Sequence, residues 1–470
     1  MNPTPTHPSH EEPSWMFYAG AFLAAALAPL GSTMIAVALP SIGQELEVSS
    51  GDLTQWLVSV YLIVGIATLS PCGKLGDYLG HRRVLGIGMA IYGGGSALGF
   101  LFATLPSLAL ARVCMAIGSA LIVPACMASI RNLVPIERRP RTFGLFGSVM
   151  GAAAATGPLL GGELTALFGW RSVFIANLPV IAIAFSGMHF GAVRRSADSV
   201  DDRLRGSHFD VVGTALLGVG LALVVVSVRM SSGLWVGLSG MGLLIIFVLR
   251  ERRVPEPVLD PDLFRHRQFV AGSAVIGLQN LAMYALLFQL PIFLENVRGA
   301  ATGTTGRTLV WMMIAMVICS PIGGRVSEKI GPKLTVFAGC LLTLAALVAI
   351  GSFDQIHAPV DVVLGLVLLG AGMGLSTAPS QAASMSAVDR GRAGMAGGAI
   401  STIRYVGGVI GISALGLAIG SGESDVIEAH TSAIVVYATA LVLATMCSWF
   451  LPGLLREESE ELVGVQGATR

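Results

Sequence analysis

Long apolar segments alternate with short polar connections along almost the whole chain. A membrane-spanning helix needs about 20 mostly apolar residues, and fourteen segments meet or approach that length. They cover residues 16–38, 54–72, 84–103, 107–130, 142–168, 171–190, 210–229, 232–250, 269–293, 306–322, 333–351, 360–381, 393–420 and 432–452. The pattern predicts an all-α integral membrane protein with fourteen transmembrane helices and with both termini on one side of the membrane.

The basic residues test this count independently. When the connections are assigned alternately to two sides, one side holds 23 of the 29 Lys and Arg residues and the other holds four. The remaining two, Arg112 and Arg404, lie inside predicted spans. Because an excess of Lys and Arg marks the cytoplasmic side, we expect both termini in the cytoplasm of a cell whose cytoplasmic (inner) membrane holds the protein.

Composition agrees with a location in lipid. Hydrophobic residues make up 54% of the chain and charged residues 12%, whereas a soluble protein carries about 25% charged residues. The net charge of +1 argues against a nucleic-acid partner. The six cysteines form no CxxC pair, which indicates neither a zinc site nor a disulfide framework. Residues 1–14 lack the basic start of a cleaved signal peptide and are expected to form a disordered tail.

One short motif occurs twice, about 250 positions apart, in the order Gly, basic, aliphatic, small, acid, x, x, Gly, x, basic. We call these two copies the first box (73–83) and the second box (324–333). The key residues are Gly73, Asp77, Gly80, Arg82 and Arg83 in the first box and Gly324, Glu328 and Gly331 in the second. A repeated charged loop at one membrane face predicts two related halves that arose by duplication.

The repeat divides the chain into parts. Six spans occupy 15–190 and six occupy 269–452, and the region 191–268 between them holds cytoplasmic linkers and two extra spans. Residues 453–470 form a cytoplasmic tail. No connection is long enough to bury the core of a soluble domain. The proline-rich and basic segment 251–268 is expected to be an extended strap on the cytoplasmic side.

Several motifs resemble those of a known family. The first box resembles the signature loop between the second and third helices of the major facilitator superfamily. Arg112 stands at the position of that superfamily's intramembrane arginine. The segment 142–168 resembles the glycine–proline motif of its antiporters. The residues that carry this second likeness are Gly151, Gly157, Pro158, Gly161 and Gly162. Segments 33–40 and 170–179 resemble the fourteen-helix drug:proton antiporter branch.

This resemblance implies a major facilitator fold and a multidrug efflux permease, which exchanges drugs for protons. One position departs from the branch. Its first helix commonly carries an aspartate just before the Ser/Thr–Thr pair, and here that position is Gly31. The chain must therefore couple to protons through another group or not couple in the same way.

Ionisable groups inside a bilayer are costly, so each is a candidate functional group. Arg112 and Glu163 lie at matching depths near the outer ends of two antiparallel spans. We expect Glu163 to face Arg112 and to carry the proton in place of the acid missing at Gly31. The alternative leaves Glu163 solvated at the outer interface and without a function.

A second set of residues is expected to line the substrate cavity. Asn280 and Tyr284 share one face of a helix that also carries Gln289; the alternative is hydrogen bonding between helices. Arg404 either binds an anionic substrate group, balances Glu163, or bonds to carbonyl groups of a broken helix. Candidates for stacking on an aromatic substrate are Trp56 and Tyr61, although Trp56 fits an interfacial anchor equally well.

The boxes and the glycine–proline motif have physical interpretations. Asp77 is expected to interact with the N-terminal end of a neighbouring helix, and Arg82 and Arg83 with acids or lipid phosphates. These contacts would form a latch that closes the cytoplasmic side in one state. Alternatively, the charges only set the topology, which leaves the repeated acid and glycines unexplained. The glycines of 142–168 permit close helix packing, and Pro158 bends the helix.

Together these features predict a monomeric secondary transporter that exports amphipathic or hydrophobic small molecules (drugs, toxins or metabolites) in exchange for protons. Its partners are the substrate, protons and the lipid bilayer. The chain has no phosphate-binding GxxxxGK[ST] loop and no catalytic constellation, so we expect neither a cofactor nor an enzyme. The alternatives are a proton-independent facilitator or exporter of a single metabolite, and a membrane sensor that has lost transport.

Overall fold

The computed structural model describes residues 15–48, 53–190, 210–227, 233–254, 257, 259–296, 302–350, 359–420 and 426–453. Within these ranges every regular element is a helix. The tail 1–14, most of the tail 453–470 and the linker 191–209 lie outside the described residues, so the expectations for them stay predictions.

The first part of the chain contains six passes. Its helices are α1 (Trp15–Leu46), α3 (Val60–Leu79), α4 (His81–Leu101), α5 (Leu105–Leu133), α6 (Arg139–Phe168), α7 (Ser172–Ile175) and α8 (Asn177–Phe190). A π-helical segment, η1 (Thr54–Ser59), leads into α3, and a 3-10 turn, η2 (Ile136–Arg138), leads into α6. The short α7 and the longer α8 together make the sixth pass.

The hairpin of α9 (Val211–Ser227) and α10 (Gly233–Glu251) follows, and then six further passes. These are α11 (Arg267–Asn296), α12 (Thr302–Ile330), α13 (Pro332–Ile350), α14 (Val363–Ser386), α15 (Ala393–Gly420) and α16 (Val426–Ser448). Short 3-10 turns, η3 (Pro261–Arg265), η5 (Pro359–Val362) and η6 (Arg390–Arg392), precede α11, α14 and α15. The order of the described helices agrees with the fourteen predicted spans.

Length and hydropathy support the same conclusion. Ten of the described helices are long and apolar enough to cross a membrane, and 212–224 and 433–448 are shorter apolar helices. Several helices run farther than predicted: α12 continues from the predicted end at 322 to Ile330. The reason is that the polar residues of the box, which end an apolar run, are good helix formers and extend the helix beyond it.

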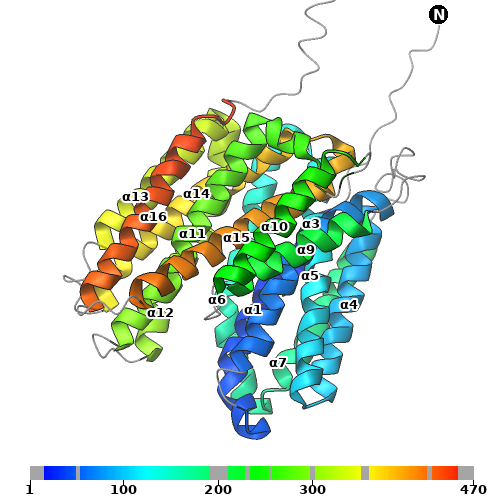
Figure 1. The fold of residues 1–470 in the computed structure, drawn as a ribbon, viewed down its shortest axis with the longest axis vertical. Helices are drawn as coiled ribbons and strands as arrows, with labels where there is room; N and C mark the ends of the chain where they lie inside the picture. Colours follow the sequence, from blue (N-terminus) through cyan, green and yellow to red (C-terminus); the bar gives the residue numbers. More distant parts are fainter. Residues whose placement is uncertain are drawn as a thin grey trace, which may run out of the picture.

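The described helices pack as two groups (Figure 1). In the first group α1 packs against α5, α6 and α8, and α4 packs against α5. In the second group α14 packs against α12 and α13, and α11 packs against α15 and α16. The groups lie together at the end drawn at the top of Figure 1 and diverge towards the other end. We call these the box end, where Gly80 and Gly331 lie, and the far end.

The hydrophobic cores explain this shape. At the box end one buried cluster combines side chains of both groups, including Met89 and Met127 from the first and Ile276 and Ile400 from the second. At the far end each group has its own cluster, around Leu27 in the first and around Phe293 in the second. Among the described residues, the buried apolar clusters combine both groups only at the box end.

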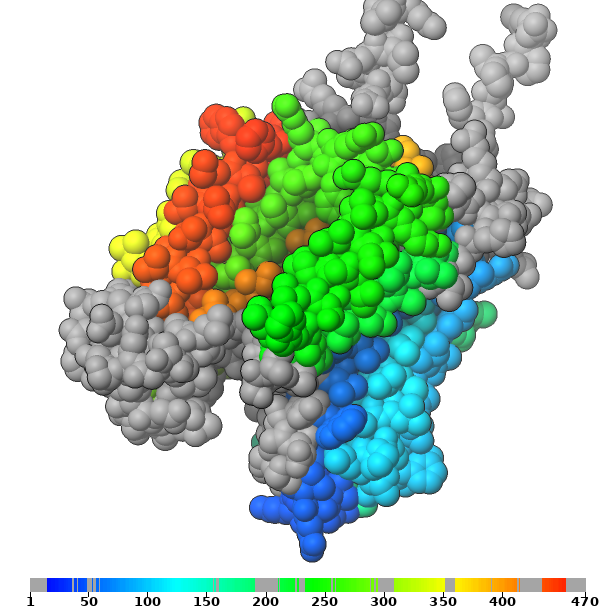
Figure 2. Space-filling view, in the orientation of Figure 1, coloured from blue at the N-terminus to red at the C-terminus, as the bar shows by residue number. Residues whose placement is uncertain are grey.

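The hairpin of α9 and α10 lies on one face of the molecule (Figure 2), where α9 packs against α3. Leu234, Trp235 and Leu238 of α10 are all more than half exposed. Large exposed apolar side chains on a spanning helix suit contact with lipid rather than water. The hairpin is thus an addition to the outside of the two groups and does not fill the space between them.

Both boxes turn in the same way. Gly80 and Gly331 have φ angles of 89° and 86°, in the left-handed region that favours glycine. The N–H of Gly80 donates to the carbonyl of Gly76 at 3.0 Å, and the N–H of Gly331 donates to that of Ser327 at 2.9 Å. The repeat noticed in the sequence is thus also a repeat of backbone geometry.

We expect Gly331→Ala to lower the stability of the detergent-solubilised protein by about 1 kcal/mol, because alanine is strained at a positive φ. The matched control is Gly86→Ala in the middle of α4, where a Cβ would meet no atom within 4 Å and alanine improves helix propensity. Thermal unfolding of both variants checks this. Equal melting temperatures for the two variants would contradict it.

Candidate functional site

The first box joins the two groups through a carboxylate. Asp77, near the end of α3, accepts hydrogen bonds from the backbone N–H groups of Gly394 at 2.6 Å and Met395 at 2.8 Å. These N–H groups belong to the first turn of α15, where helical donors have no partner within the helix. A carboxylate at the positive end of the helix dipole is stabilised. The contact predicted for Asp77 is therefore present.

Glycine lets this contact form. A Cβ on Gly73 would collide with the backbone carbonyl of Gly394, so only glycine allows α3 and α15 to approach this closely. One turn further along α15, a Cβ on Gly398 would likewise collide with the backbone of α3. The first glycine of the box thus sets the distance that the acid then bridges.

The second box makes the same kind of contact, but from the second group to the first. Glu328, near the end of α12, interacts with the backbone N–H of Arg141 in the first turn of α6. A Cβ on Gly324 would collide with Pro140. Each box therefore holds the start of the fifth pass of the other group. Arg82 and Arg83, by contrast, form no ion pair with any described residue, and Arg83 is exposed.

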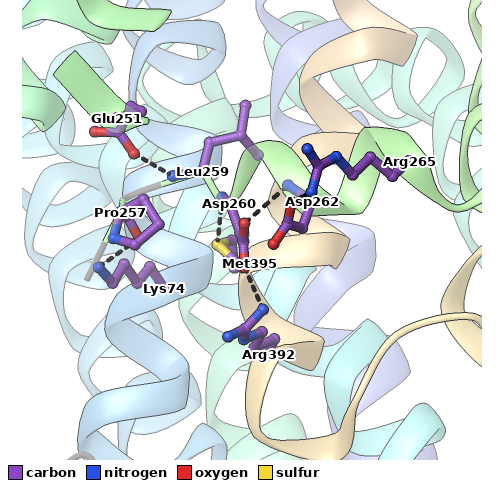
Figure 3. Close-up of polar contacts among 9 residues, drawn as sticks. All are labelled: Lys74, Glu251, Pro257, Leu259, Asp260, Asp262, Arg265, Arg392 and Met395. Atoms are coloured by element: carbon purple, nitrogen blue, oxygen red, sulfur yellow. Dashed lines mark hydrogen bonds and ion pairs between the residues drawn. The ribbon is translucent and has the colours of Figure 1, made fainter. Parts of the chain in front are cut away.

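A polar network that the sequence did not reveal covers this junction (Figure 3). Lys74 of the first box donates to the carbonyl of Pro257 at 2.6 Å, and Asp260 forms an ion pair with Arg392 just before α15. Leu259 donates from its backbone to Glu251 at 3.1 Å. The strap predicted at 251–268 is thus attached to both groups. The only indication of this attachment in the sequence was the proline-rich and charged composition of the segment.

Arg131 adds a third cross-connection at the box end. It lies in the last turn of α5, and its Nε and Nη2 donate to the carbonyls of Met385 and Val388, each at 2.6 Å. These carbonyls lie at the C-terminal end of α14, where the last carbonyl groups of a helix are unsatisfied. In the sequence, Arg131 was counted only as one of the basic residues of a connection, and nothing there indicated this role.

The intramembrane arginine is buried at the far end of the first group. Arg112 is 1% exposed. Its Nε donates to the carbonyl of Leu57 at 2.7 Å, its Nη1 donates to that of Gly31 at 3.2 Å, and its guanidinium lies 4.0 Å from the centre of the Tyr61 ring. Backbone carbonyls and an aromatic face stabilise the charge in place of a carboxylate.

The predicted contact between Glu163 and Arg112 is wrong for this state of the protein. Glu163 is exposed, and no described side chain forms an ion pair with it. Equal depth along two helices did not bring them together, because Glu163 lies on a face of α6 turned away from the interior. Whether Glu163 carries a proton is untested and stays a prediction.

The departure at Gly31 has a structural explanation. A Cβ at this position would collide with the hydroxyl oxygen of Tyr92, which itself donates to the carbonyl of Leu27 at 2.7 Å. Tyr92 is fully buried. The space next to α1 that an aspartate would need is filled by this tyrosine, and the carbonyl of Gly31 serves Arg112 instead.

The glycine–proline motif packs α6 onto α1. A Cβ on Gly157 would collide with Thr33, and one on Gly161 would lie 2.7 Å from the carbonyl of Met34. This is the close approach predicted from the small residues. Gly151 instead faces Met316 of α12 in the other group, and Gly162 is half-buried. The side chain of Pro158 lies outside the described part.

The predicted cavity residues divide into two sets. Tyr284 and Arg404 lie close enough for electrostatic interaction with each other and with Tyr405. Tyr61 lines a small cavity of about 20 Å³ together with Tyr405, across the boundary between the groups. These residues meet at the centre of the molecule, and Tyr405 was missed because a single tyrosine in an apolar helix carries no pattern.

The other three predicted residues lie elsewhere. Asn280 is buried and donates to the carbonyl of Ile276 in its own helix at 2.8 Å, and Gln289 is fully buried within the second group. Both fit packing between helices rather than the cavity. Trp56 is 47% exposed in η1 at the far end, which suits the interfacial anchor.

A helical membrane fold of two six-pass groups, joined at one end by a repeated carboxylate contact, defines a multi-pass membrane transporter. The chain belongs to the major facilitator superfamily: the family described as Major Facilitator Superfamily matches residues 21–412.

Individual relatives agree. The multidrug resistance protein Stp of Mycobacterium tuberculosis (strain CDC 1551 / Oshkosh) is 31% identical over 414 residues, which cover 85% of this chain and 75% of Stp. The tetracenomycin C resistance and export protein of Streptomyces glaucescens is 30% identical over 406 residues, covering 84% and 74% of the two chains. The fold is also similar to that of the proton:xylose symporter XylE, with a TM-score of 0.67 at 14% identity, covering 95% of this chain and 98% of XylE.

We expect Gly31→Asp to destabilise the protein by about 1–3 kcal/mol, because the new side chain must displace the buried hydroxyl of Tyr92. Combining it with Tyr92→Phe, which removes that hydroxyl, should restore most of the loss. Thermal unfolding of both single variants and the double variant measures the coupling. Strictly additive effects would show that the two positions do not compete for space.

Proposed function

We propose that this protein is a secondary transporter of the cytoplasmic membrane, which exports amphipathic or hydrophobic small molecules by alternating access. The observation that carries this proposal is the asymmetry between the ends. The two groups share a core at the box end and have separate cores at the far end. Alternating access requires that two halves close around a central site at one end while they are apart at the other.

The charge distribution supports an orientation. The excess of Lys and Arg in the connections that include both boxes favours a cytoplasmic box end and cytoplasmic termini. In that orientation the described state faces outwards: the route to the cytoplasm is closed by the shared core, and the far end gives access from outside. An exporter releases its substrate from this state.

The contacts of the box end act in this proposal as the latch of the outward-facing state. Asp77 and Glu328 hold the starts of α15 and α6, Arg131 holds the end of α14, and Asp260 pairs with Arg392. Hydrogen bonds to charged groups contribute about 1.5–3 kcal/mol each. The contacts that join one group directly to the other must break when the cytoplasmic side opens, and the strap must release one of its two attachments.

Export, rather than uptake, is supported by the relatives. One is named for multidrug resistance and another for the export of tetracenomycin C. The fourteen passes and the glycine–proline segment of α6 favour the drug:proton antiporter branch of the superfamily. Proton antiport is therefore the finer form of the proposal, with Glu163 as the candidate proton carrier, without direct contact to Arg112.

A second candidate is a facilitator or single-metabolite exporter that does not use protons. The observation in its favour is the environment of Arg112, where carbonyl groups of Gly31 and Leu57 replace the usual acid. With no carboxylate to protonate beside this guanidinium, Arg112 belongs to no described ion pair that a proton could switch.

We expect Asp77→Asn to shift the protein towards the state with a closed far end. Loss of the charge weakens both hydrogen bonds to α15, which changes the ratio of the two states about tenfold. Spin labels at Leu101 of α4 and Val348 of α13, both exposed, report the opening of the far end in a cysteine-free background. The distance between them should shorten.

Asp260→Asn should act in the same direction, because it removes the ion pair to Arg392. Its matched control is Asp262→Asn, since Asp262 is exposed and pairs only with Arg265 of the same short turn. Unchanged distance distributions in both Asp77→Asn and Asp260→Asn would refute the latch.

Energy coupling separates the two candidate functions. In inverted membrane vesicles loaded by the transporter, an ionophore that collapses the proton gradient should abolish accumulation of a fluorescent drug if the protein is an antiporter. Glu163→Gln should then flatten the pH dependence of transport. Accumulation that follows only the drug gradient, with the same pH profile in Glu163→Gln, would support the facilitator.

A further inference from the structure

We propose that Arg404, together with Gln381 and the tyrosines around it, forms a subsite for the anionic group of an aromatic substrate. This inference rests on the proposed function and names the substrate class: aromatic molecules that carry a carboxylate, sulfonate or phenolate, in preference to cations of the same shape.

The position of Arg404 suits a substrate contact. It lies on α15 eleven residues after Ala393, which places it about 16 Å along the helix from the box end. Three different passes supply the groups around it, since Gln381 belongs to α14 and Tyr284 to α11. The side chain of Arg404 is partly buried, and its Nε is fully enclosed.

The hydrogen bonding of the site is incomplete. Nη2 of Arg404 donates to Oε1 of Gln381 at 3.2 Å. This bond orients the amide, so that Nε2 of Gln381 points away as a donor. That nitrogen and the Nε of Arg404 are both buried and have no hydrogen-bond partner among the described residues, and Gln381 is 2% exposed. Unsatisfied buried donors are costly, and both are of the kind that an anion would accept from.

The charge of the site is uncompensated. No described carboxylate forms an ion pair with Arg404; the neighbours that interact with its charge are Tyr405 and Tyr284. The other intramembrane guanidinium, Arg112, is likewise bonded to carbonyl oxygens. A desolvated positive charge without a counter-charge attracts anions and repels cations. The described interior therefore favours anionic ligands over cationic ones.

The tyrosines supply the aromatic part of the proposed selectivity. The ring of Tyr284 packs against α15, where a Cβ on Gly408 would lie 2.7 Å from it. Tyr405 and Tyr61 line a small cavity from opposite groups. The present cavity of about 20 Å³ has no room for an aromatic ring, so the tyrosines must separate to admit one. Aromatic rings on both sides of the boundary then favour a flat ring between them, with its acidic group directed to Arg404.

A series of three probes that share one ring tests this proposal: 2-naphthoate, 2-naphthalenemethanol and 2-naphthylmethylammonium. Binding to the purified full-length protein is measured by titration calorimetry. We expect naphthoate to bind at least about tenfold more tightly than the ammonium compound, and Arg404→Gln to weaken naphthoate about tenfold while the alcohol is unchanged. Arg404→Lys should retain part of the preference, because it keeps the charge.

The matched control is Arg83→Gln, which removes an exposed arginine at the box end and should leave all three affinities unchanged. The wild-type series needs no variant, so the test survives if Arg404→Gln fails to fold; Gln381→Leu then provides the second variant. Naphthoate that binds no better than the ammonium compound, or that does not bind at all, would overturn the proposal. So would an unchanged preference in folded Arg404→Gln.

Transport of the same probes in proteoliposomes separates this inference from the proposed function. Selective binding of naphthoate without transport would refute export and leave the subsite intact. Transport of the ammonium compound as fast as naphthoate would leave export intact and refute the subsite.

Discussion

The packing of two groups of helices against each other at the box end depends on one contact made twice: a carboxylate placed at the first turn of a helix from the opposite group. Asp77 and Glu328 serve this purpose for α15 and α6. The glycines of each box make the contact possible, because any side chain at Gly73 or Gly324 would collide with the partner backbone. Such a contact is strong when it is formed. Because both donors belong to a single helical turn, the two hydrogen bonds form and break together. This is what a two-state transporter requires of the end that closes.

The strap adds a feature that two six-pass halves alone would lack. The extra hairpin of α9 and α10 stays outside the two groups, yet the segment that follows it bonds to Lys74 on one side and to Arg392 on the other (Figure 3). The insertion is thereby tied to the same junction as the boxes. Movement of one group relative to the other must therefore move this segment or break one of its contacts. The extra helices are thus connected to the junction of the two groups even though they contact mainly α3.

The interior shows how a membrane protein keeps positive charge without acids. Two nitrogens of Arg112 donate to carbonyl groups, one of which is exposed by a π-helical segment at Leu57 and another by the absence of a side chain at Gly31. Arg404 has a single amide oxygen. The first guanidinium is therefore a structural tie between α1, η1 and α5, whereas the second bonds to one side chain of α14; each keeps one buried nitrogen that has no partner among the described residues. What distinguishes Arg404 as a candidate substrate contact is the second unsatisfied buried donor beside it, Nε2 of Gln381.

The sequence by itself determined the all-helical class, the order of the passes, the two boxes and even the partner expected for Asp77. Apolar length and the spacing of a repeated motif are properties of consecutive residues, and a bilayer makes them nearly sufficient. Only the tertiary structure decided that Glu163 turns away from Arg112, that Tyr92 fills the place of an aspartate, and that Asp260 meets Arg392. These outcomes depend on how each helix is rotated about its axis and on contacts between residues far apart in the chain. The local pattern of hydrophobic and polar residues determines neither.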